Sequence, residues 1–266
     1  MLMFPTDITS VARTILELFG LPEGGLEAGA VPADKRVLAC APKGGIKKLL
    51  IYAPDAIGRL MVEKLPAEFL RLELAGFLKV PLRSVFPSKT PVCFASMFSG
   101  LTPEGHGIRR YEKPVLTHKT IFDALPEHGV RTAIAAVKDS SIDLIFRGRG
   151  VDYFSEPDDR GVTVRALELI KTGAHDCIMA YHQEYDDLLH AGDPWNSAAL
   201  EAAKRHVLAF KALTGAFDKK WSGLPRGAAF APDHGAHAGP DGRGTHGDNI
   251  PDDMEIFHYW GLRPGK

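Results

Sequence analysis

Cysteine, long apolar runs and an excess of charge of either sign are all scarce in this chain of 266 residues. Its three cysteines, Cys40, Cys93 and Cys177, are too few and too widely spaced for a disulfide framework or a zinc knuckle, so we expect reduced, partly buried thiols. No run approaches the roughly 18 apolar residues of a membrane-spanning helix, and the N-terminal stretch lacks the basic and apolar segments of a secretory leader. We therefore expect a soluble, cytoplasmic protein without a membrane partner.

The charge balance excludes another class of partner. Lys and Arg number 32, Asp and Glu number 33, and the formal net charge is −1. Without an overall positive field we expect no nucleic acid polymer to bind, and a phosphate-binding site would need its own local charge.

Short apolar runs alternate with helical patterns along the chain. Runs typical of buried strands occupy 49–54, 131–137, 142–146, 176–181 and 227–231. Helical patterns occupy 8–19, 56–75, 91–99, 117–128, 161–173 and 196–214. This alternation predicts a single α/β domain over 1–266, with a helical and loop lead-in at 1–45 and a mostly parallel central sheet between helices.

Four short segments place acidic residues and histidines just beyond predicted strands, where open α/β sheets carry their sites. The first contains Asp55, which directly follows the run 49–54. An isolated aspartate there is most often a helix cap or turn former, so Asp55 becomes a candidate only in combination with the other segments.

The second segment contains Thr90, directly before Pro91, a residue suited to the first turn of a helix. A threonine in this position is most often only an N-cap. In the alternative interpretation, its hydroxyl and the N–H groups of the helix start face one space and form a phosphate site. A metal there would lower the hydroxyl pKa enough to make Thr90 a nucleophile.

The third segment, 180–194, contains Asp186, Asp187 and His190. Asp186 and His190 are four residues apart and would share one face of a helical turn, which lets them chelate one ion. Asp187 with His190, three apart, is an alternative that spacing leaves open, as is a solvated surface turn.

The fourth segment, 230–249, falls mostly in the polar loop 232–250 and carries Asp233, His234, His237 and His246 among glycines. An adjacent Asp-His pair after an apolar strand, with a further histidine in the same loop, is difficult to explain by packing. Because His and Asp are the usual ligands of zinc, this loop predicts a metal site.

In this order and spacing the segments resemble the alkaline phosphatase superfamily, specifically its branch of type I phosphodiesterases and nucleotide pyrophosphatases. The resemblance spans about residues 49–260 and favours Asp186 over Asp187. The motifs are Asp55 after a strand, Thr90 in PSKT…SGLTPEGHGI, Asp186 and His190 as D-x3-H, the triplet Asp233-His234-Gly235, and His246 in GTHG.

The resemblance implies an alkaline phosphatase-like fold and two divalent metal ions, with zinc as the expected metal and manganese as the other metal that suits these donors. It implies one ion held by Asp186, His190 and His246, and another held by Asp55, Asp233, His234 and the Thr90 oxygen. It also implies that Thr90 attacks phosphorus to give a phosphothreonine, which water activated at the first metal then hydrolyses. The expected substrate is a small phosphate monoester or diester.

One stretch departs from this family. Nucleotide pyrophosphatases have an Asn shortly after the HGI turn, whereas this chain has Arg109, Arg110 and Tyr111. An arginine would hold a monoester by bidentate bonds and the tyrosine hydroxyl would serve a diester, although exposed arginines are the norm. His237 is a further candidate for a substrate contact. The segments 109–125 and 147–165 are the expected rims of an open site.

Hydrolysis of a phosphonate or a sulfate ester on the same scaffold is the main alternative. A sulfatase needs Cys or Ser in a C/S-x-P-x-R context, and Cys93 is followed by neither that Pro nor that Arg. A non-catalytic metal-binding member of the family is the alternative from another class. Retention of all seven ligand positions and the nucleophile argues against it.

Overall fold

A computed structural model describes residues 4, 6–21, 25–27 and 29–266 of the chain. Seven strands form one sheet in the order β2-β9-β6-β1-β5-β3-β4. From β6 to β4 the neighbouring strands are parallel, whereas β9 pairs antiparallel with both β6 and β2. The strands are β1 (Lys48–Pro54), β2 (Leu78–Arg83), β3 (Thr132–Val137), β4 (Asp152–Glu156), β5 (Cys177–His182), β6 (Arg226–Phe230) and β9 (Glu255–Arg263). The mostly parallel sheet predicted from the sequence is confirmed.

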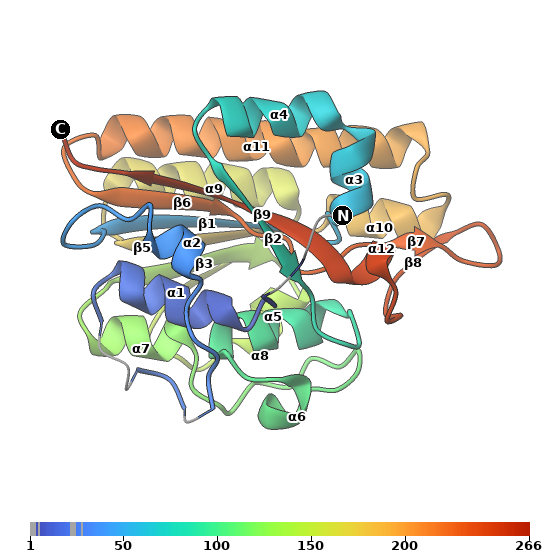
Figure 1. Cartoon of the computed structure of the whole chain (residues 1–266), viewed down its shortest axis with the longest axis horizontal. Helices are drawn as coiled ribbons and strands as arrows, with labels where there is room; N and C mark the ends of the chain where they lie inside the picture. Colours follow the sequence, from blue (N-terminus) through green and yellow to red (C-terminus); the bar gives the residue numbers. More distant parts are fainter. Residues whose placement is uncertain (1–3, 5, 22–24, 28) are drawn as a thin grey trace.

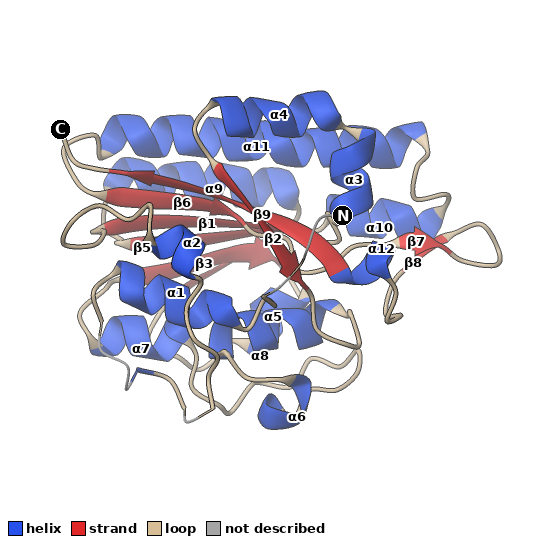
Figure 2. Ribbon diagram, viewed as in Figure 1, coloured by secondary structure: helices blue, strands red, loops and turns tan. Residues whose placement is uncertain are grey.

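Helices cover both faces of this sheet (Figures 1 and 2). One face carries α1 (Ser10–Leu18), α2 (Lys35–Leu38), α5 (Thr90–Ser99), α7 (Ile121–Glu127) and α8 (Ser141–Ile145). The other carries α3 (Arg59–Lys64), α4 (Pro66–Leu74), α9 (Asp159–Thr172), α10 (Glu184–Ala191) and α11 (Ser197–Lys220). The short helices α6 (Pro103–His106) and α12 (Pro251–Met254) and the ribbon β7 (His237–Ala238) with β8 (Gly244–Thr245) lie in connections. No helix in the described ranges combines the length and apolar character that crossing a membrane requires.

The central strand β1 shows why the core has two layers. Leu49 and Ile51 pack in the cluster under α1 and α5, while Leu50 and Tyr52 pack in the cluster under α9 and α11. All seven residues of β1 are buried because helices cover both faces, which explains its unbroken apolar run. Successive side chains of β1 therefore point to opposite faces of the sheet.

The predicted strand 142–146 is wrong, because this run lies in helix α8. The side chain of Ser140 caps that helix by accepting a hydrogen bond from the Asp143 N–H at 3.2 Å. Ile142 and Ile145 are both fully buried, and their separation of three residues places them on one face of a helix. A short apolar run is compatible with either a strand or a helix, and here it forms a helix. The pattern 56–75 likewise contains two helices, since Pro66 begins α4.

Candidate active site

The predicted site residues converge at the carboxyl ends of the parallel strands. Asp55 follows β1, Asp186 and His190 lie in α10 directly after β5, and Asp233 with His234 follows β6. Thr90 begins α5, and His246 lies just beyond β8. This is the edge at which open α/β sheets bind ligands.

The first group of donors surrounds the hydroxyl of Thr90. Thr90 Oγ1 lies 3.3 Å from Asp55 Oδ2 and 3.4 Å from His234 Nε2. His234 Nε2 lies 3.4 Å from Asp55 Oδ1 and 3.3 Å from Asp233 Oδ2. All four side chains are buried. The structure therefore brings the hydroxyl and three metal-type donors to one point.

The second group lies beside the first. Asp186 Oδ1 is 3.5 Å from His190 Nε2 and 3.4 Å from His246 Nε2, and the two Nε2 atoms are 3.0 Å apart. The His246 ring stacks on that of His234 with centroids 4.0 Å apart, which joins the two groups. Asp187 Oδ2 instead accepts a hydrogen bond from Gln183 Nε2 at 3.2 Å. Of the two alternatives left open by spacing, the structure brings Asp186 into the group.

All three histidines of these groups present the same ring nitrogen. His234, His190 and His246 each direct Nδ1 at a backbone carbonyl, at 2.9, 3.1 and 2.7 Å respectively. A neutral ring that donates its Nδ1–H in this way keeps an unprotonated Nε2, and here each Nε2 faces the carboxylates. This is the arrangement in which an imidazole binds a metal ion.

The charges of the two groups are unbalanced without a cation. Burial, together with the neighbouring Asp233 and Asp186, raises the pKa of Asp55 well above its ordinary value, and burial raises the pKa of Asp233 to about 7. In the described part of the chain, Asp186 Oδ1 and Asp233 Oδ2 are buried and have no hydrogen-bond partner. Buried carboxylate oxygens without partners are costly and rare, and there is one in each group. Both groups therefore fit a divalent cation.

Two further residues support the site, and no local sequence pattern identified them. Tyr181, whose side chain points to the Thr90 side of the sheet, donates its hydroxyl to Asp55 Oδ2. Asp253 is fully buried and accepts the N–H groups of Gly247 and Asp248, both at 2.8 Å, and pairs with His237 Nδ1 at 2.7 Å. Asp253 thus holds the turn that follows His246, and His237 pairs with Asp253.

A cavity of about 230 Å³ lies over Thr90. Its lining includes Tyr111, Lys113 and Lys138, together with the α8 residue Ser141. The predicted rim 109–125 therefore contributes to this cavity, whereas residues of 147–165 line a neighbouring one.

The remaining predicted substrate contacts lie outside this lining. Arg109 and Arg110 are exposed, and Arg110 pairs with Glu112 at 2.9 Å. His237 also lies outside it. A substrate contact of Arg109 or His237 remains a prediction from the sequence.

Solved structures share the fold of this chain. The C-terminal periplasmic domain of phosphoethanolamine transferase EptC from Campylobacter jejuni aligns over 82% of this chain and 80% of that one, with a TM-score of 0.57 and 16% identity. Phosphonoacetate hydrolase from Sinorhizobium meliloti, in complex with phosphonoformate, aligns over 74% of this chain and 59% of that one, with a TM-score of 0.55 and 16% identity. Murine ectonucleotide pyrophosphatase/phosphodiesterase 5, an inactive variant in complex with AMP, aligns over 72% and 58%, with a TM-score of 0.55 and 16% identity.

At these identities the likeness establishes the fold alone, and the chain spans about three fifths of the length of the latter two proteins. No curated protein gives a significant match. The family model of type I phosphodiesterases and nucleotide pyrophosphatases matches residues 55–260, well over half of the chain and all of the motifs that form the two donor groups. The chain therefore belongs to the type I phosphodiesterase/nucleotide pyrophosphatase family.

Proposed function

We propose that this chain is a two-metal phosphoric ester hydrolase that acts through a covalent phosphothreonine at Thr90. The observation that carries the proposal is the position of the Thr90 hydroxyl. It lies at the N-terminus of the buried helix α5, within 3.4 Å of Asp55 and His234, beside two donor groups that each hold a carboxylate oxygen without a partner. Membership of a phosphodiesterase family supports the same reaction class.

The donor sets decide which metal we propose. Asp186, His190 and His246 would hold one ion, and Asp55, Asp233, His234 and Thr90 would hold the other. Mixed imidazole and carboxylate donors suit zinc, and manganese is the second metal compatible with them. Such ions, when bound, neutralise phosphoryl oxygens and lower the pKa of a hydroxyl nucleophile.

The side chains around Thr90 define its part in the reaction. The hydroxyl faces Asp55 and His234, which would hold the ion that lowers its pKa, and the positive end of α5 faces the space where the phosphoryl group would lie. Thr90 loses its proton to solvent in the cavity, and the Oγ–phosphorus bond forms as the bond from phosphorus to the leaving oxygen breaks. The leaving oxygen takes up a proton from the same solvent and departs as the alcohol. A water molecule then attacks the phosphothreonine, which restores the hydroxyl and releases phosphate from a monoester or a phosphate monoester from a diester.

The lining of the cavity indicates a small anionic substrate. Lys113 and Lys138 supply positive charge beside Thr90, and Tyr111 and Ser141 supply hydroxyl groups. This set suits the doubly charged oxygens of a phosphate monoester or a diester with a further anionic group. The same lysines favour, as a second candidate, a phosphonate that carries another anionic group. The name of one structural relative, phosphonoacetate hydrolase, is consistent with that chemistry.

The test is turnover by zinc-reconstituted protein on a p-nitrophenyl phosphate monoester, diester and sulfate, and on a carboxylated phosphonate. We expect Thr90→Ala to reduce kcat on the preferred ester by roughly a thousandfold or more while the two donor groups beside residue 90 keep close to two ions. Acid quenching of the wild-type reaction should trap a phosphoryl adduct on the peptide that contains Thr90.

The matched control is Thr102→Ala, which removes the cap of the short helix α6 and should leave kcat nearly unchanged. Substantial turnover by Thr90→Ala would refute the nucleophile. Preference for the sulfate or the phosphonate would assign the alternative hydrolase. No turnover on any substrate despite bound metal would indicate a non-catalytic metal-binding protein.

A further inference from the structure

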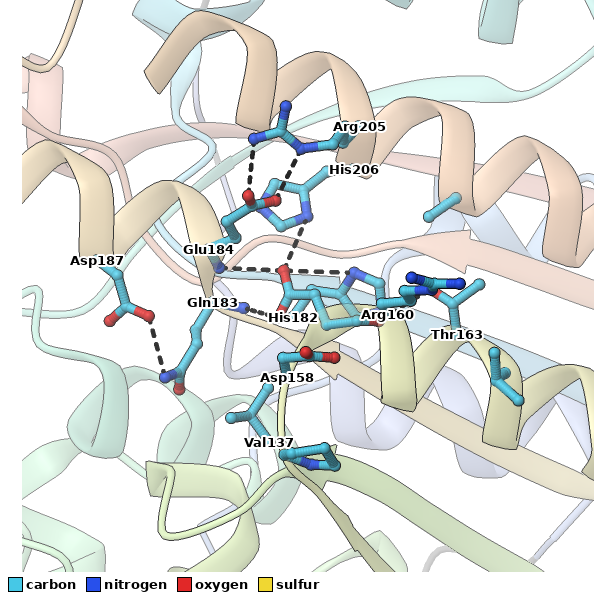
Figure 3. A pocket seen from close by; sticks show the side chains of 14 residues that line it. Val137, Asp158, Arg160, Thr163, His182, Gln183, Glu184, Asp187, Arg205 and His206 are labelled. Carbon is cyan, nitrogen blue, oxygen red and sulfur yellow. Dashed lines mark hydrogen bonds and ion pairs between the residues drawn. The ribbon is translucent and has the colours of Figure 1, made fainter. Parts of the chain in front are cut away.

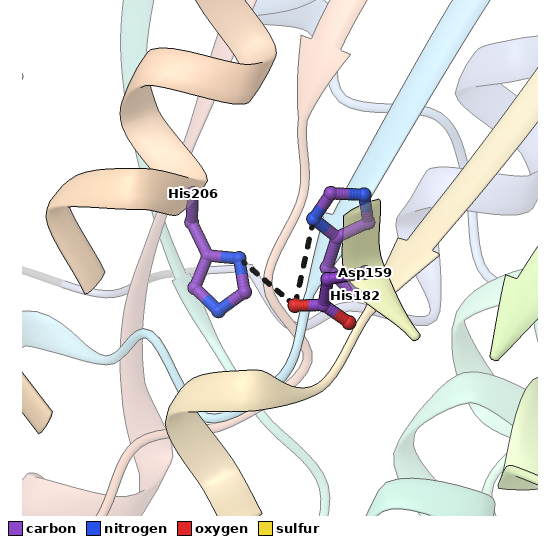
Figure 4. A group of neighbouring side chains, drawn as sticks. All are labelled: Asp159, His182 and His206. Carbon is purple, nitrogen blue, oxygen red and sulfur yellow. Dashed lines mark ion pairs between the residues drawn. The ribbon is translucent and has the colours of Figure 1, made fainter. Parts of the chain in front are cut away.

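A separate group of donors lies at the same edge of the sheet, on the face covered by α9 and α11. Asp159 begins α9, His182 ends β5 and His206 lies in the middle of α11 (Figure 4). His182 Nδ1 is 3.6 Å and His206 Nδ1 3.8 Å from one oxygen, Asp159 Oδ2. Both histidines are fully buried, and burial lowers their pKa values, which keeps the rings neutral.

We propose that Asp159, His182 and His206 form a third cation site, suited to zinc or a similar transition metal. Two ligands that are each about 2.1 Å from a tetrahedral zinc ion lie roughly 3.4 Å from one another. The two observed donor separations exceed that value by only a few tenths of an ångström. Two imidazoles and one carboxylate are a donor set that favours zinc over magnesium or calcium.

The charge of Asp159 supports a cation at this position. Its carboxylate accepts the N–H groups of Gln183 at 2.9 Å and Glu184 at 3.0 Å, at the start of α10, but among the described residues it forms no ion pair with Lys or Arg. Arg205 is instead bonded to Glu184 at 2.9 and 2.7 Å. Burial raises the pKa of Asp159 to about 7, because its carboxyl group faces two neutral rings and, within the described ranges, no ion-pair partner, and a bound metal ion would supply the missing positive charge.

The group also borders a cavity of about 540 Å³ (Figure 3). Asp159, His182 and His206 belong to its lining, so a water molecule or ligand could reach the fourth coordination position from the cavity. Gln183 and Asp187 line both this cavity and the one over Thr90. The third site would therefore be separated from the Thr90 site by a shared wall.

The ion would compete with hydrogen bonds made by the same rings. The Tyr52 hydroxyl is 2.8 Å from His182 Nδ1 and 3.1 Å from His206 Nδ1. His206 Nε2 accepts the N–H of Tyr185 at 3.3 Å. Coordination would displace Tyr52 from both nitrogens, move the ring proton of His206 to Nε2 and remove the bond from Tyr185. We therefore expect this site to bind zinc more weakly than the Thr90 site and to fill after it.

The test counts bound metal. Wild-type protein and His206→Gln are stripped with chelator, dialysed to equilibrium against a series of zinc concentrations, and their bound zinc is measured by elemental analysis. The variant should bind one equivalent fewer than the wild type at saturation. His106→Gln is the matched control, because His106 is also buried and hydrogen-bonded, to Ser96 at 2.8 Å, but lies outside the donor groups, and it should keep the wild-type count.

The comparison between variants does not depend on catalysis, so it separates this proposal from the function proposed for Thr90. Equal counts in wild type and His206→Gln would overturn the third site even if turnover is normal. If His206→Gln does not fold, anomalous scattering at the zinc edge from a wild-type crystal replaces it. A peak between Asp159, His182 and His206 is the expected result, and its absence overturns the proposal.

Discussion

Groups of potential metal ligands lie on both sides of one sheet edge, and the two sides differ in how their histidine rings are hydrogen-bonded. On the Thr90 side, the rings of His190, His234 and His246 are each fixed by a backbone carbonyl at Nδ1, and two carboxylate oxygens have no partner in the described chain. On the α9/α11 side, His206 Nε2 accepts the backbone N–H of Tyr185, so the ring proton lies on Nδ1, the nitrogen that faces Asp159.

The difference shows that donor type alone does not prepare a metal site. The position of the ring proton decides whether a histidine offers a free lone pair, and that position depends on what the other nitrogen contacts. On the Thr90 side the ring protons already point away from the expected ions, and only the contact between the Nε2 atoms of His190 and His246, 3.0 Å apart, has to open around a metal. In the Asp159 group an ion must first displace the hydrogen bonds that Tyr52 and Tyr185 make with the histidine rings.

The largest effect should come from removing a ligand charge on the Thr90 side. Asp233→Asn replaces a buried carboxylate that faces His234, and we expect kcat to fall by roughly a thousandfold, with loss of bound metal. Asp159→Asn, on the other side, should reduce kcat by about tenfold or less. Steady-state kinetics with elemental analysis tests the contrast, and equal losses would remove the distinction between the sides. Asp218→Asn, at an exposed carboxylate that pairs with the buried Arg226 far from both groups, is the control.

A smaller effect should follow from loosening the turn after His246. Asp253→Asn replaces one of the two carboxylate oxygens by an NH2 group. Whichever oxygen is replaced, the side chain loses either its bond to the Gly247 N–H or its bond to His237. We expect zinc affinity at the Thr90 side to fall about 10- to 100-fold, as for other residues that orient metal ligands. Competition with a zinc-binding dye measures the change. The neighbouring Asp252→Asn, which removes a surface partner of Arg59, should leave the affinity unchanged, and a similar loss there would contradict this role.

The Asp159 side can be altered through its competing hydrogen bonds. Tyr52→Phe keeps the packed ring but deprives both histidine Nδ1 atoms of a partner, so metal-free protein should lose about 2 kcal/mol of stability. The same change should raise the zinc affinity of the Asp159 group. Urea unfolding after chelation and zinc titration measure the two effects, with the exposed Tyr111→Phe as the stability control. Weaker zinc binding would mean that Tyr52 assists the ion.

The smallest effect concerns His106, a buried histidine that lies outside the donor groups on either side. It supplies a baseline for pH studies of the metal-free protein. Burial, with a contribution from His118, lowers the pKa of His106 to about 4. Because the folded pKa lies below the unfolded value of about 6.5, neutral His106 stabilises the fold above pH 6.5, and this stability is lost as the pH falls towards 4.

We expect this loss to be about 1.5 kcal/mol between pH 6.5 and 5, and to be reduced in His106→Gln. Chemical unfolding at both pH values measures it. An equal acid-induced loss in the variant would assign that loss to other groups.

The central strands could be predicted from the sequence, whereas the outer strands could not. The strands β1, β3, β5 and β6 are buried throughout and mostly apolar because helices cover both of their faces. The strands β2 and β4 are only partly buried at the sheet edges, and β9 contains His258 within its buried part. Their mixed composition gave no period that distinguishes a strand from a loop.

The sequence by itself determined which strands form the centre of the sheet, which segments carry chemistry, and, through the family resemblance, which donors belong to each of the two groups around Thr90. Only the tertiary structure decided which histidine nitrogen faces the carboxylates and that Tyr181 holds Asp55. It also decided that Asp159, His182 and His206 meet on the opposite face. The physical reason is that local spacing fixes residues on one element. Ring protonation, burial and charge compensation depend on contacts between elements far apart in the chain.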